Sequence, residues 1–124
     1  MLDPAGLRLA APIVRPTPDL VAPDGVNTTF YAAPEDIPED DDAFPNFFGT
    51  SGAAPHAAAV AALLQSRALR GNGARLAPDE IERLLAISAV DMSAPGFDFD
   101  TRYGLIDARA AVEALEDRLR AEAR

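Results

Sequence analysis

The chain has 124 residues, which fits one small domain or a piece of a larger one. Apolar residues make up 48% of the sequence, so a folded chain with a buried core is expected rather than disorder. The formal net charge of −9 argues against nucleic acid as a partner, and the absence of cysteine excludes a disulfide scaffold, a thiolate zinc site and a cysteine nucleophile.

The first 34 residues mix short apolar runs with proline, glycine and asparagine. This pattern predicts short strands at residues 7–14, 20–22 and 26–31. The N-terminal stretch MLDPAGLRLAAPIV has neither a basic leader nor a long apolar core, so no signal peptide is predicted in this chain. No window reaches the roughly 18 apolar residues of a membrane span, so we expect a soluble chain that does not enter a membrane.

Residues 35–43 read EDIPEDDDA, with six acids in nine positions and no periodicity. We interpret this run as a solvated acidic loop. The alternative is a calcium site built from these carboxylates, although their spacing is not that of an EF-hand. No other cofactor is predicted.

Three helices are predicted in the second half of the chain. Residues 51–69 are rich in alanine and lack a polar face, which predicts a helix that is buried on most sides and ends before Gly71. Pro78 followed by two acids opens a second helix. Asp107 can cap a third helix, whose charged end in 109–124 is expected to fray. Short strands followed by these helices give an α/β pattern.

The stretch FFGTSGAAPH, residues 47–56, carries the chemistry. Ser51 stands at the start of a helix, where the first amides lack intrahelical partners and can donate to an anion. In acyl transfer that anion is the oxyanion of the tetrahedral intermediate. Gly49 and Gly52 are expected to leave space for a substrate backbone, and Pro55 to loosen or kink the first turn. Serine is also a common helix cap, so Ser51 alone would not indicate catalysis.

Three stretches of the chain resemble the subtilase family of serine peptidases. Residues 49–56 match every fixed position of its nucleophile motif, Gly-Thr-Ser-x-Ala-x-Pro-His. Residues 18–23, PDLVAP, resemble the family's Pro-Asp-Val-Val-Ala-Pro segment, and residues 103–108, YGLIDA, resemble a segment near the end of its catalytic domain. The resemblance therefore covers residues 18–108. It implies that residues 1–124 form part of a peptidase domain, the C-terminal portion of a subtilisin-like α/β fold in which the nucleophile helix is buried.

The resemblance also implies an activity, serine endopeptidase cleavage of polypeptides by acyl transfer. Ser51 would be the nucleophile and its backbone amide an oxyanion donor, while Gly49, Thr50 and Gly52 would bind substrate. Two positions depart from the family, because Gly52 stands where methionine is common and Arg102 where glycine is usual. Most subtilases are exported, and the signal for export would lie upstream.

The remaining catalytic groups of the family are expected upstream of residue 18. Subtilases run Asp, His, Ser along the chain, and an Asn completes the oxyanion hole. Residues 1–17 contain no His and no Asn. The chain's one histidine, His56, follows Ser51 by five positions on the same predicted helix, about 140° around its axis, so it cannot serve as the base. In the family the matching histidine is structural.

We therefore expect this chain to be nearly inert alone and to have the missing N-terminal part of the catalytic domain as its partner. The alternative is a catalytically inactive binding or scaffold module derived from a subtilase.

Overall fold

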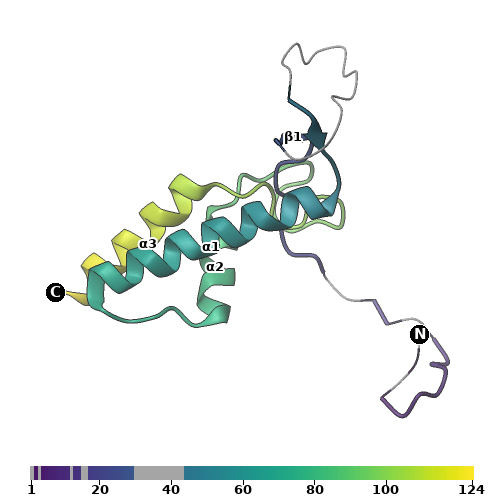
Figure 1. The fold of residues 1–124 in the computed structure, drawn as a ribbon. Helices are drawn as coiled ribbons and strands as arrows, with labels where there is room; N and C mark the ends of the chain where they lie inside the picture. Colours follow the sequence, from purple (N-terminus) through teal and green to yellow (C-terminus); the bar gives the residue numbers. More distant parts are fainter. Residues whose placement is uncertain (1, 3, 12, 15–16, 30–43) are drawn as a thin grey trace.

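The structure is a computed structural model that describes residues 2, 4–11, 13–14, 17–29 and 44–124 (Figure 1). Its elements run in the order β1 (Val26–Asn27), β2 (Asn46–Phe47), α1 (Thr50–Asn72), α2 (Pro78–Ser88) and α3 (Ala108–Glu122). This is the mixed α/β order that the sequence predicts. The predicted acidic loop at 35–43 lies outside the described residues.

The three helices enclose the core. α1 and α3 run side by side, and α2 packs against both near the middle of α1 (Figure 1). One narrow stripe of α1 faces the core, because its buried side chains recur at every fourth position. The buried apolar residues of the core are Val60, Leu64, Ala68, Leu76, Leu84, Leu85, Ala111 and Leu115.

The prediction that α1 is buried on most sides was wrong. Of its 23 residues, only Gly52, Val60, Leu64 and Ala68 are buried. Leu63 is 54% exposed and Leu69 is 43% exposed. The physical reason is that α2 and α3 cover only one side of the helix. Within the described residues, no helix is long and apolar enough to cross a membrane.

α1 also ends later than predicted. It runs through Asn72, and Gly73 closes it in the left-handed conformation, with φ 74°. Gly71 lies inside the helix and faces α3, where a Cβ atom would lie 2.7 Å from Cδ1 of Leu119, so its lack of a side chain lets α1 and α3 approach closely. The helix continues without a break through Pro55.

The starts of α2 and α3 confirm the sequence signals. α2 begins at Pro78 with two acids in its first turn. Asp107 caps α3, because its Oδ1 accepts a hydrogen bond of 2.9 Å from the amide of Ala110. The predicted fraying of the C-terminal end is not seen. α3 extends to Glu122, and an ion pair between Arg118 and Glu122, four residues apart, spans its last turn.

The strands are shorter than predicted. Of residues 26–31, only Val26–Asn27 form a strand, which pairs antiparallel with Asn46–Phe47, while residues 30 and 31 lie outside the described residues. Val21 makes a single parallel bridge to Leu105, and in the region of 7–14 the described pairing is one bridge between Leu2 and Arg8.

Candidate functional site

The turn before α1 places Ser51 in the first turn of the helix. The N-cap residue is Gly49, whose φ of 91° and ψ of 179° belong to a region that only glycine readily adopts. Its carbonyl accepts from the amides of Gly52 at 2.8 Å and Ala53 at 3.2 Å. Because Gly49 has no side chain, it cannot cap the helix itself.

Ser51 has the two features that its proposed chemistry needs. Its side chain is exposed. Within the part of the chain that the structure describes, neither its hydroxyl nor its backbone amide has a hydrogen-bond partner. An unpaired amide at the positive end of a helix is free to donate to an anion.

His56 is held by its own helix. Its Nδ1 lies 2.8 Å from the carbonyl oxygen of Gly52, and because a carbonyl only accepts, Nδ1 carries the hydrogen. The ring is therefore bonded to the preceding turn of α1 and not to the Ser51 hydroxyl, as the helical spacing predicts.

Asp24 ties the turn before Ser51 to the segment that precedes β1. Its Oδ1 accepts from the amide of Gly49 at 2.6 Å and from the amide of Gly25 at 2.9 Å. The side-chain amide of Asn46 donates to the carbonyl of Gly25 at 3.0 Å and to Oδ1 of Asn27 at 2.9 Å. No local sequence pattern points to a role for Asp24 or Asn46 at this site, since the contacts that give them a role join positions about twenty or more residues apart.

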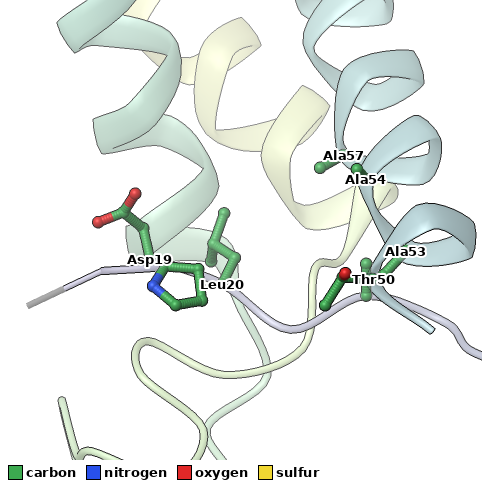
Figure 2. A pocket seen from close by; sticks show the side chains of 8 residues that line it. Asp19, Leu20, Thr50, Ala53, Ala54 and Ala57 are labelled. Atoms are coloured by element: carbon green, nitrogen blue, oxygen red, sulfur yellow. The ribbon is translucent and has the colours of Figure 1, made fainter.

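A shallow hollow of about 280 Å³ lies between residues 18–22 and the start of α1. Figure 2 shows its lining side chains, with Thr50 and the alanines of α1 across from Leu20, and with the Asp19 carboxylate pointing away from Thr50. Gly49 lines an adjoining hollow together with Asp24.

Gly52 occupies a different environment from the other residues expected to bind substrate. It is buried, and a Cβ atom there would lie 3.0 Å from the carbonyl oxygen of Phe47. Its lack of a side chain lets α1 begin close to β2.

The three stretches that resemble one family meet in space. Pro18, Asp19, Leu20 and Ala22 line the hollow beside the start of α1, and the same segment runs alongside residues 103–106. The amide of Val21 donates to the carbonyl of Gly104, and the amide of Ile106 donates to the carbonyl of Val21, both at 2.9 Å. Residues far apart in the sequence thus form one unit around the start of α1.

The comparisons with known proteins agree with this arrangement. The model of the Subtilase family matches residues 13–104. The chain belongs to the subtilase family.

Two solved structures show the same local fold. One is a lanthipeptide protease, with 30% identity and a TM-score of 0.54 over 59% of this chain. Another is the psychrophilic subtilisin-like protease Apa1 from Pseudoalteromonas sp. AS-11, with 30% identity and a TM-score of 0.53 over 64% of this chain. The match covers 22% and 17% of those proteins, so the chain spans about a fifth of the length of each.

Arg102, which replaces the glycine usual in subtilases, keeps a glycine-like backbone. Its φ is 62°, in the left-handed region that favours glycine. The guanidinium lies 5.2 Å from the ring centre of Phe99 and 5.9 Å from that of Phe97, and one of its nitrogens donates to the carbonyl of Thr17. These cation–π contacts offset part of the backbone strain.

Asp98 closes the turn that leads into Arg102. Its Oδ1 accepts from the amides of Asp100 at 2.7 Å and Thr101 at 2.6 Å. The hydrogen bond from Thr101 is the main reason that the pKa of Asp98 lies below its ordinary value.

The acids and the one histidine of the described residues do not gather into a metal site. Among residues 2, 4–11, 13–14, 17–29 and 44–124, no group of three or more His, Asp or Glu side chains could hold an ion. The carboxylates considered as a calcium site, at 35–43, lie outside these residues.

Proposed function

We propose that this subtilase chain carries the nucleophile segment of a serine endopeptidase that cleaves polypeptides by acyl transfer. The observation that carries the proposal is Ser51, whose exposed hydroxyl and unpaired backbone amide share the first turn of α1. Membership in the subtilase family supports this role, because residues 49–56 match the family's nucleophile motif. In this proposal residues 1–124 are one part of a peptidase domain.

In the proposed mechanism, Oγ of Ser51 attacks the carbonyl carbon of the scissile bond. A histidine base takes the hydroxyl proton and later gives it to the leaving amine. The Ser51 amide donates to the oxyanion that forms. Water then hydrolyses the acyl-enzyme and regenerates the Ser51 hydroxyl. Gly49 and Thr50, which line the hollows at the start of α1, are proposed to contact the substrate backbone.

The base must come from elsewhere, because His56 is bonded to Gly52. We propose that the rest of a subtilase catalytic domain supplies the His, the Asp and the oxyanion Asn. Removal of the catalytic His costs about 10⁶ in kcat in a subtilisin, a measurement made on a member of this family. Loss of one oxyanion donor by itself costs about 10²–10³ in kcat. The 124-residue chain alone is therefore expected to be nearly inert.

The first test is labelling of the purified chain with a fluorophosphonate probe. We expect no labelling above the level of Ser51→Ala. Ser66→Ala is the matched control, since Ser66 is also exposed on α1. Labelling that disappears in Ser51→Ala and persists in Ser66→Ala would show that the chain has its own base, and the proposed inertness would be wrong.

The second test supplies the missing groups. Residues 18–108 replace the corresponding segment of the protease Apa1, and the chimera is assayed on casein after circular dichroism shows that it is folded. Cleavage that Ser51→Ala abolishes and Ser66→Ala retains supports the endopeptidase role. A folded chimera without cleavage contradicts that role.

The second candidate function is an inactive binding or scaffold module derived from a subtilase. The exposure of two leucines on α1, Leu63 and Leu69, favours it, because exposed apolar side chains are suited to a partner surface. The rest of a catalytic domain would cover the same two side chains, so the activity of the chimera separates the two functions.

A further inference from the structure

Asp24 places a carboxylate beside the amide of Gly49, the N-cap residue of α1. The N-cap Gly49 has no side chain, and the first turn of α1 contains no acid. Asp24, 25 positions earlier than Gly49, brings a carboxylate oxygen to 2.6 Å from the Gly49 amide. A negative charge near a helix N-terminus is favourable, and a hydrogen bond to a carboxylate is stronger than one between neutral groups.

The turn that carries Asp24 is itself fixed to the strand before Ser51. Asn46 donates to the carbonyl of Gly25. The ring of Phe48 lies against Gly25, where a Cβ atom would come within 3.0 Å of it. Gly25 has φ 65°, so a larger residue would be strained there as well as crowded. The turn that carries Asp24 is therefore held in place at Gly25 by both Asn46 and Phe48.

We propose that Asp24 is a positioning residue for the nucleophile, an inference that rests on the proposed endopeptidase function. It acts through Gly49, whose unusual backbone angles set the direction in which α1 begins and hence where Ser51 lies. Asp24 does not bond to Ser51. A misplacement of about 1 Å in a reacting group can lower a rate by about 10².

The chain offers a matched control at Asp19. It lies on the same segment as Asp24 and lines the same hollow as Thr50. Its carboxylate points away from Thr50 (Figure 2), and within the described residues that carboxylate has no hydrogen bond. Removing Asp19 therefore changes the charge of the segment by the same amount and leaves the contact with Gly49 intact.

Amide NMR on the 124-residue chain tests the Asp24 contact without any need for activity. In Asp24→Ala we expect the Gly49 amide proton to move upfield and to exchange about tenfold faster or more, because a hydrogen bond to a charged group is lost. The Ser51 amide should also shift, although Asp24 does not touch it. Asp24→Asn, which keeps an oxygen acceptor, should show smaller changes, and Asp19→Ala should leave Gly49 and Ser51 unchanged.

Two results would overturn the positioning role. One is a Gly49 and Ser51 spectrum in Asp24→Ala that matches the wild type. The other is an equal acceleration of exchange throughout α3, which would mean a general loss of stability. In an active chimera, Asp24→Ala should lower kcat by about 10–100-fold with KM little changed, and an unchanged kcat would also refute the role. An inactive chimera counts against the endopeptidase function, whereas the amide spectra decide the Asp24 contact in either case.

Discussion

Leu63 and Leu64 are neighbours on α1 with opposite environments, and their replacement tests how this chain is stabilised. Leu64 is 0% exposed and belongs to the core between the helices, whereas Leu63 is 54% exposed. Leu64→Ala removes buried atoms and leaves a cavity, which costs about 2–5 kcal/mol. Leu63→Ala should change stability by less than about 0.5 kcal/mol, as exposed substitutions usually do.

The loss of stability expected from Leu64→Ala is large compared with the total free energy of unfolding. Small domains unfold with a free energy of about 5–15 kcal/mol. Among the described residues the core has eight buried apolar residues, so one cavity removes a substantial fraction of that free energy. Urea unfolding followed by circular dichroism at a helical wavelength measures both variants. Equal destabilisation by the two substitutions would refute the one-sided burial of α1. A Leu63→Ala effect that grows with protein concentration would show that this face is covered by another copy in solution.

Two further predictions concern the frame around the site. Gly104→Ala should destabilise the chain by more than about 3 kcal/mol, because φ is 107° and a Cβ atom would lie 2.1 Å from the Val90 carbonyl oxygen. The control Gly96→Ala, where φ is 83° and the space around the residue is open, should cost only about 1 kcal/mol. Similar melting temperatures for the two variants would contradict this prediction. The pKa of Glu116 lies below its ordinary value mainly because of its hydrogen bond with Arg67, so the stability from this pair is present above about pH 4.5 and lost as the pH falls through the lower folded-state pKa. In thermal melts from pH 7 to pH 3, the melting temperature of Glu116→Gln should therefore fall less than that of the wild type. An identical fall would be evidence against a stabilising contribution from the pair.

The helices could be predicted because their signals are local. The start of α2 is indicated by Pro78 and the two acids that follow it. The start of α3 is indicated by Asp107, which lies three residues before the amide that it caps. The end of α1 was misplaced because glycine is normally a helix breaker, whereas Gly71 lies within the helix, where its missing side chain leaves room for Leu119 of α3.

The strands could not be predicted with the same success, because a strand depends on a partner. Val21 pairs with Leu105, 84 positions later, and β1 pairs with β2 across the acidic run. An apolar run between prolines indicates where a strand could form, but its length is set by the partner available to it. The prediction that α1 is buried on most sides failed for a related reason. The alanine-rich composition shows that the helix could be buried, but it does not show which elements cover it.

In the candidate site, too, the features with local signals could be predicted and those that depend on distant residues could not. The position of Ser51 at the start of a helix follows from the eight residues 49–56, which contain both the turn and the helix former. The role of Asp24 could not be predicted from its neighbours in the sequence, because Asp24-Gly25 indicates only a turn. Its hydrogen bond to Gly49 exists because the pairing of β1 with β2 brings that turn against the start of α1. A motif thus locates the reactive serine, while the residue proposed to hold it in position emerges only once strands distant in sequence are paired.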